Sequence, residues 1–226
     1  MMITRHYLTV GNRRVHYRRA GQGPAIVLLH ASPVSSEVFE EVHFPILAKE
    51  FTVIAIDTPG QGFSDRLDLG RQERIEDLAD ALAETLEILG VEHCALYGRH
   101  TGASIAVEYA RRFPKRASLA ITDGFPLFSA TVRDEYMKHY LAEIVPDWAG
   151  SHLLWWWFRY REQHVFWPWN KHEGANRADQ DVPNLDFLQR GTREILVAGN
   201  TYQNPYAAAF LHEGIPCVHD IIKGPV

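Results

Sequence analysis

Cysteine is scarce in this sequence, with only Cys94 and Cys217 among 226 residues. Two cysteines cannot form a disulfide framework, and no ligand spacing typical of a metal site occurs, so we assign no metal and no cofactor. Long apolar runs are also lacking. The densest, Leu153 to Phe158, is far too short to cross a bilayer, and the first ten residues lack the apolar stretch of a signal peptide. We therefore expect a cytoplasmic protein with no membrane partner.

An excess of basic residues is missing as well. The chain carries 23 Lys and Arg against 28 Asp and Glu, a formal net charge of −5. A nucleic-acid partner usually requires a basic face, so this class of function is excluded. The length suffices for one domain with a modest insertion, and the sequence does not indicate the oligomeric state.

The first half of the sequence alternates strand and helix patterns. Strands are predicted at 7–10, 14–19, 25–29, 52–56, 94–97 and 117–122, and helices at 36–50, 73–89 and 100–112. The first two strands flank Gly11-Asn12, which is typical of a hairpin turn. Strands that alternate with helices imply an α/β fold with a mostly parallel sheet.

After Asp123 the pattern becomes helical. Helices are predicted at 132–144, 151–163, 184–198 and 206–212, with prolines between them. A helical block that follows a strand is typical of an insertion above the carboxyl edge of the sheet, where open α/β sheets bind ligands. We therefore divide the chain into a core at 1–123, a helical cap at 124–220, and the start of a further core segment at 221–226.

Three short motifs follow one another at the ends of predicted strands. They are LLHASP at 28–33, DTPGQGFSD at 57–65 and YGRHTGA at 97–103. Together they resemble the α/β-hydrolase family, with its His-Gly-x-Pro turn, its Asp-x-Pro-Gly loop and its Gly-x-nucleophile-x-Gly elbow. The stretch 30–36 and the helical cap resemble the haloalkane dehalogenase and epoxide hydrolase branch. The resemblance implies a sheet of the α/β-hydrolase type beneath a cap.

By this resemblance His100 occupies the nucleophile position, where the family has serine, cysteine or aspartate. Gly98 and Gly102 leave room for the sharp turn of the elbow. The backbone N–H of Thr101 is implied as one oxyanion donor, and that of Ala31 or Ser32 as the other. Dehalogenase chemistry is not expected, because position 100 is not a carboxylate and threonine, not tryptophan, follows it.

Two roles are open to an imidazole at this position. The N-terminal end of a helix disfavours imidazolium, and a neutral ring either attacks a carbonyl itself or acts as general base on a water. Asp123, at the end of the strand before the cap, is the candidate acid. Its alternative is a structural role, capping the following turn.

Three further residues are predicted to line the pocket. His30 follows the third strand, and in this family such a residue more often orders the oxyanion loop than performs chemistry. Trp155 and Trp156 are candidates for an apolar lid above the elbow, and the alternative is that they only pack the cap onto the sheet.

The sequence stops at Val226, where residues 221–226 resemble the start of the strand after the cap. The last two strands, with the usual acid and histidine of the family, are missing, which predicts a truncated chain. The expected function is hydrolysis of a small, mostly apolar, ester-like substrate. The alternatives are a catalytically silent protein that binds a small apolar molecule on the same fold, and a fragment with no function.

Overall fold

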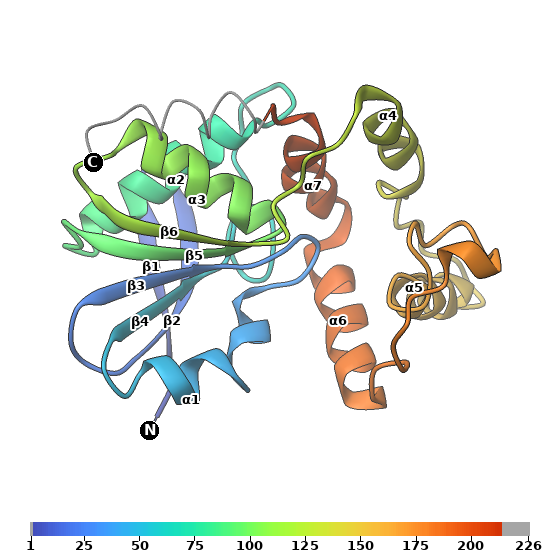
Figure 1. The fold of residues 1–226 in the computed structure, drawn as a ribbon, viewed down its shortest axis with the longest axis horizontal. Coiled ribbons are helices and arrows are strands. Elements are labelled where there is room, and N and C mark those ends of the chain that lie inside the picture. Colours follow the sequence, from blue (N-terminus) through green and yellow to red (C-terminus); the bar gives the residue numbers. More distant parts are fainter. Residues whose placement is uncertain (1, 214–226) are drawn as a thin grey trace.

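A six-stranded mixed sheet forms the centre of the computed structural model, which describes residues 2–213 (Figure 1). Its strands are β1 (Thr4–Val10), β2 (Arg13–Ala20), β3 (Ala25–Leu29), β4 (Thr52–Ile56), β5 (Cys94–Arg99) and β6 (Ala117–Asp123). The strand order is β1-β2-β4-β3-β5-β6. β1 and β2 pair antiparallel, β2 pairs antiparallel with β4, and the other four strands are parallel. The predicted α/β fold with a mostly parallel sheet is confirmed.

Helices cover both faces of the sheet. Helices α2 (Ile75–Ile88) and α3 (Thr101–Arg112) lie on one face, and the short α1 (His43–Leu47) lies on the other (Figure 1). Residues of β3 alternate between these layers: Leu29 packs in the cluster that includes α2 and α3, and Leu28 packs with Phe44 of α1. Burial of each such side chain contributes roughly 1.5–3 kcal/mol, which explains why β3 is a continuous apolar run.

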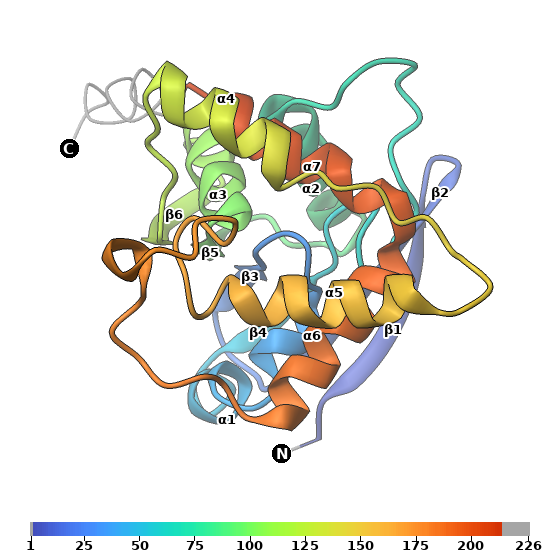
Figure 2. The same cartoon turned by 90° about the vertical axis from the view of Figure 1, so that its right-hand side faces the viewer.

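The helical cap lies over the carboxyl ends of the parallel strands (Figures 1 and 2). It consists of α4 (Ala130–His139), α5 (Ser151–Glu162), α6 (Leu185–Ala198) and α7 (Gln203–Leu211). Its own apolar cluster includes Trp156, Leu188 and Ile195. Helix α7 also reaches the core, because Ala208 and Ala209 pack in the cluster beneath α2 and α3. Within residues 2–213, no helix combines the length and apolarity that a bilayer crossing requires.

Two helix predictions were wrong in their extent. The predicted helix at 36–50 is two short pieces, the 3-10 helix η1 (Ser36–Phe39) and α1, because Pro45 has no N–H to donate and its ring would clash with the carbonyl four residues earlier. The predicted helix at 132–144 ends at His139. Beyond it, the backbone of Ile144 is bonded to the side chain of Asn200 in the cap instead. The core segment predicted at 221–226 lies outside the described residues.

Candidate functional site

A strained elbow between β5 and α3 carries His100. Its φ of 48° is the only positive φ of a non-glycine residue in the described chain, a conformation that costs roughly 1–3 kcal/mol. The two glycines make the turn sterically feasible. A Cβ on Gly98 would lie 2.1 Å from the carbonyl oxygen of Gly102, and a Cβ on Gly102 would lie 2.1 Å from that of Leu29.

The His100 ring packs against the backbone of Gly124, just beyond β6. Its Nδ1 lies 3.2 Å from the Gly124 carbonyl oxygen. Because a carbonyl only accepts, this contact requires the proton on Nδ1, and it leaves the lone pair on Nε2. Burial, reinforced by the positive charge of Arg99, lowers the pKa of His100, and Asp123 opposes this only in part. The imidazole is therefore neutral at pH near 7, as its position at a helix start predicted.

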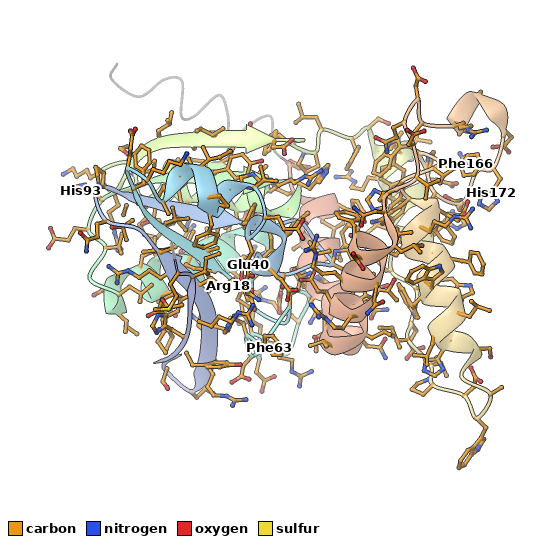
Figure 3. The ribbon with its side chains drawn as sticks, turned by 90° about the horizontal axis from the view of Figure 1, so that it is seen from below. Arg18, Glu40, Phe63, His93, Phe166 and His172 are labelled. Atoms are coloured by element: carbon orange, nitrogen blue, oxygen red, sulfur yellow. The ribbon has the colours of Figure 1, made fainter. Side chains whose placement is uncertain are left out.

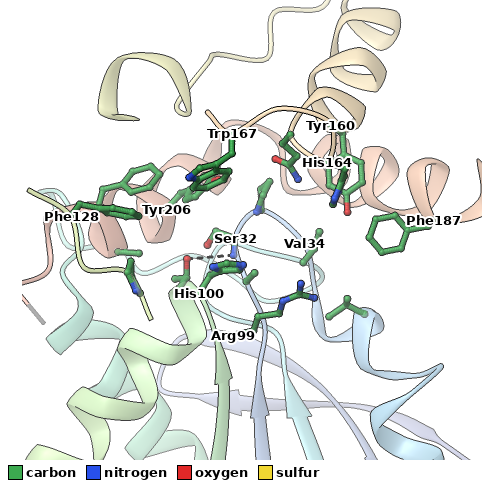
Figure 4. Close-up of a pocket in the computed structure, with 18 residues that line it drawn as sticks. Ser32, Val34, Arg99, His100, Phe128, Tyr160, His164, Trp167, Phe187 and Tyr206 are labelled. Atoms are coloured by element: carbon green, nitrogen blue, oxygen red, sulfur yellow. Dashed lines mark hydrogen bonds between the residues drawn. The ribbon is translucent and has the colours of Figure 1, made fainter. Parts of the chain in front are cut away.

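The two backbone segments expected to form the oxyanion hole meet beside His100. The N–H of Ser32 points to Oγ1 of Thr101, at 3.4 Å (Figure 4). The N–H of Thr101, at the start of α3, has no acceptor among residues 2–213. Ala31, Ser32 and Thr101 all line the cavity above the elbow.

A cavity of about 330 Å³ lies above His100, between the elbow and the cap (Figure 4). Its core side is formed by residues 31–34, Val38 and 99–101. Its cap side is largely aromatic, with Phe128, Tyr160, Trp167, Phe187, Tyr206 and Phe210, to which Gln163 and His164 add polar groups. A volume of this size suits a small ligand, and the aromatic wall suits an apolar one.

His30 is fully buried behind the cavity wall and does not line it. Its Nδ1–H donates to the carbonyl oxygen of Ala31 at 2.9 Å, and its Nε2 accepts from the backbone N–H of Thr58 at 3.0 Å. Burial lowers the pKa of His30, consistent with this neutral form. His30 thus links the turn after β3 to the loop after β4.

The two tryptophans predicted for the pocket do not line the cavity. Trp156 is buried inside the cap, with its ring centroid 5.5 Å from that of Tyr202, and Trp155 lies against it, half exposed. One turn further along α5, Tyr160 reaches the cavity. A second aromatic run in the sequence, Phe166-Trp167-Pro168-Trp169, supplies Trp167 to the cavity instead.

Asp123 lies beside the elbow, but its carboxylate does not bond the imidazole. Oδ2 accepts from the hydroxyl of Tyr97 at 2.9 Å and lies 3.5 Å from Nε of Arg99. Asp123 contacts His100 only through the backbone, where the N–H of His100 donates to the carbonyl oxygen of Asp123 at 2.8 Å. Among the described residues, no carboxylate or second histidine hydrogen-bonds the His100 ring.

The Asp-x-Pro-Gly loop has a structural centre in Asp57, which is fully buried. Its carboxylate accepts from His16 Nδ1 at 2.8 Å, from the backbone N–H groups of Ser36 and Phe63, both at 2.9 Å, and from the Ser36 hydroxyl. Burial alone would raise its pKa, but these hydrogen bonds outweigh burial and hold the pKa of Asp57 well below its usual range.

A buried arginine completes this cluster. Arg18, 1% exposed, lies 3.5 Å from Asp57 and donates to Glu40 at 2.6 Å and to the Ser36 hydroxyl at 2.6 Å (Figure 3). We call Asp57, His16, Arg18, Ser36 and Glu40 the Asp57 network.

The described part of the chain holds no group of three or more potential metal ligands.

Comparison with known proteins agrees with the observed architecture. A family model described as alpha/beta hydrolase fold matches residues 24–212. An uncharacterised hydrolase of Saccharomyces cerevisiae is 30% identical over 141 residues, which are 58% of this chain and 48% of that protein. A soluble epoxide hydrolase of Corynebacterium sp. is 36% identical over 108 residues, 48% of this chain and 37% of that protein. The chain thus spans about half the length, or less, of the curated relatives it matches.

Solved structures agree on the architecture. E-2-(acetamidomethylene)succinate hydrolase superposes with a TM-score of 0.70 at 18% identity, over 97% of this chain and 78% of the other. The epoxide hydrolase CorEH superposes with a TM-score of 0.67 at 23% identity, over 94% and 75%. At these identities the likeness concerns the fold alone.

Proposed function

The chain belongs to the α/β-hydrolase fold family, and from that premise we propose that it hydrolyses a small, mostly apolar, ester-like substrate through His100. One observation carries the proposal: a neutral imidazole stands at the elbow beneath an apolar cavity, with its Nε2 lone pair unused. A strained backbone at such a residue is typical of functional sites.

We propose that His100 is a general base. Nε2 takes a proton from a water in the cavity, and the water oxygen bonds to the acyl carbon while the carbonyl electron pair moves onto oxygen. The N–H of Thr101 stabilises that oxyanion, together with the N–H of Ser32, for which the oxyanion replaces Thr101 Oγ1 as acceptor. The intermediate then collapses, the carbon–oxygen bond to the leaving group breaks, and the imidazolium returns its proton to the departing alkoxide. The products are a carboxylic acid and an alcohol, and the ring is neutral again.

The rival chemistry is direct attack by Nε2, which would give an acyl-imidazole. Release of that acyl group would need a second base to activate water. No such group hydrogen-bonds His100 within residues 2–213, so a single residue that removes and returns one proton fits the site better.

The experiment compares the wild-type chain with His100→Ala and His93→Ala, using para-nitrophenyl acetate, butyrate and hexanoate. His93 is exposed and remote from the cavity, and serves as the matched control (Figure 3). General-base catalysis contributes roughly a hundredfold to ten-thousandfold, so His100→Ala should lose about that much in kcat/KM and His93→Ala should lose none. Equal activity of all three proteins would refute the proposal.

Two further readouts separate the alternatives. Mass spectrometry of protein quenched during turnover detects an acyl group on the peptide that contains His100 only if the ring is the nucleophile. If no ester is turned over by the wild type, but phenylpropionate or phenylpropanamide binds in calorimetry, the chain is instead a silent ligand-binding protein.

A further inference from the structure

The residues that line the cavity carry charge of one sign only. Among the 18 residues that line the cavity in the described chain, none is aspartate or glutamate, and Arg99 carries the sole formal charge. A charge acts more strongly on a ligand where apolar side chains exclude water than it does in bulk water. A ligand therefore meets one positive charge and no carboxylate in the lining, since Asp123, the partner of Arg99, lies outside it.

Arg99 ends β5, directly before His100, and points toward the part of the cavity near Val34 and Phe187, away from Phe128 and Trp167 (Figure 4). Its Nε lies 3.5 Å from Asp123, and its side chain is 45% exposed. Its two terminal nitrogens have no acceptor within residues 2–213. The fork of a guanidinium with free terminal N–H groups matches a carboxylate in geometry and charge.

A second guanidinium lies behind the cap wall. Arg159 of α5 is only 4% exposed, and no aspartate or glutamate of the described chain pairs with it. It donates to Oε1 of Gln163, a cavity residue, at 2.9 Å and stacks 4.4 Å from the ring centroid of Trp169, while its Nε has no hydrogen-bond partner. A buried cation without a counter-ion is costly, and an anion in the adjacent cavity offsets that cost.

The two positive charges act on the same cavity residue, His164. Its Nε2 is buried and lacks a partner in the described structure. Burial first, and then Arg99 and Arg159, lower the pKa of His164 to about 4. At neutral pH it is therefore an uncharged ring that faces the cavity without an assigned hydrogen bond, which suits a donor to a ligand oxygen.

We propose that the substrate carries a carboxylate, bound between Arg99 and His164, with its apolar body against Phe128 and Trp167. This assignment rests on the proposed hydrolysis at His100, since it orients the substrate across that residue. The substrate class is then an ester-like derivative of a monoanionic acid, with the scissile carbonyl between the anionic end and the aromatic end.

The test uses two esters of matched length, para-nitrophenyl hydrogen glutarate and para-nitrophenyl hexanoate. Wild-type protein should favour the anionic ester, and higher ionic strength should reduce that preference. Loss of a charge-assisted hydrogen bond lowers affinity by roughly tenfold or more, so Arg99→Gln should reduce the ratio of the two kcat/KM values by about that factor. Arg19→Gln, exposed on β2, is the matched control and should leave the ratio unchanged.

Calorimetry with phenylpropionate and phenylpropanamide tests the carboxylate site without turnover. The acid should bind more tightly than the amide, and both Arg99→Gln and His164→Phe should abolish the difference. If neither ester is cleaved but the acid is still preferred, hydrolysis fails and the anion site stands. Equal binding of acid and amide by wild-type protein, or a preference that survives in both variants, overturns the anion site.

Discussion

Two sets of polar side chains, joined by the segment 30–36, differ in how their charges are matched. In the Asp57 network each buried charge has its partner: Asp57 accepts from His16 and Ser36, and Arg18 donates to Glu40. Around the cavity the matching fails. Arg159 has no counter-ion within the described chain, and Nε2 of His164 has no partner there.

This difference distinguishes polar side chains that hold the fold together from polar side chains that are available to a ligand. A charge buried with its partners is satisfied by the fold itself and has nothing left to offer a ligand. A polar group left unpaired at a cavity wall is satisfied only when something enters. By this criterion Asp57 has a structural role, holding the strands to η1, whereas we propose that the chemistry takes place at His100.

The largest expected effect tests this structural role of Asp57. Asp57→Asn removes one partner of a buried, hydrogen-bonded cluster, which typically costs about 3–5 kcal/mol of unfolding free energy. Asp65→Asn changes the same residue type in the same loop, but at a half-exposed site bonded to Arg14, where the loss should stay below about 1 kcal/mol. Urea denaturation of both variants measures this, and similar losses would remove the distinction between paired burial and surface pairing.

Glu194 is an intermediate case, because it is hydrogen-bonded but forms no ion pair among residues 2–213. Its carboxylate accepts from the hydroxyl of Ser35 at 2.6 Å and from its N–H at 3.2 Å, and burial raises the pKa of Glu194 from 4.5 to about 7. A folded-state pKa above the unfolded one gives stability that is present below about pH 4.5 and is lost as pH rises through about 7.

Glu194→Gln should therefore flatten the decline of unfolding free energy between about pH 4.5 and about pH 7, by roughly 2–3 kcal/mol. Denaturant titrations at several pH values measure the slope. Glu41→Gln is the control, since Glu41 is exposed and pairs with Arg190 from the same helix, α6. An unchanged slope in Glu194→Gln would mean that burial leaves this carboxylate unperturbed.

A smaller effect is expected at the elbow, with opposite sign. His100→Gly removes the Cβ strain of a positive φ and should stabilise the fold by about 1 kcal/mol while abolishing hydrolysis. His93→Gly, in an exposed segment without that strain, should lose a few tenths of a kcal/mol. A destabilised His100→Gly variant would show that the ring contributes packing that outweighs its strain.

The smallest effect concerns the pH profile of kcat/KM. The lowered pKa of His100 keeps the base form available, so activity should be flat near neutrality and fall only below pH 6.5, the ordinary histidine value. Arg99→Gln removes a positive neighbour and should move the inflection upward. An inflection at or above 6.5 in the wild type would contradict the neutral ring.

The core could be predicted from sequence further than the site. Gly98 and Gly102 identified the elbow in the sequence. At both positions another backbone segment comes so close that only glycine, which has no Cβ, can be accommodated. The cap side of the cavity has no comparable sequence motif. Phe128, Tyr160 and Trp167 come from separate segments whose relative placement depends on how the cap packs, and no periodicity reports that.

Aromatic composition alone also does not tell which cap residues line the cavity and which are buried inside the cap. Trp156 and Tyr160 lie one turn apart on α5, yet only Tyr160 reaches the cavity, because Tyr202 covers Trp156. The contact between Glu194 and Ser35 spans 159 positions of sequence and was equally invisible. Long-range pairing, rather than local propensity, decides these positions.

The short segment from Ser32 to Ser36 connects the elbow, the cap and the core. Ser32 offers its N–H at the elbow, Ser35 is tied to Glu194 of the cap, and Ser36 is tied to Asp57 of the core. A shift of α6 therefore pulls on the oxyanion turn without passing through the sheet. In mechanical terms, the segment acts as a lever between the cap and the elbow, and the buried carboxylate of Asp57 is its fulcrum.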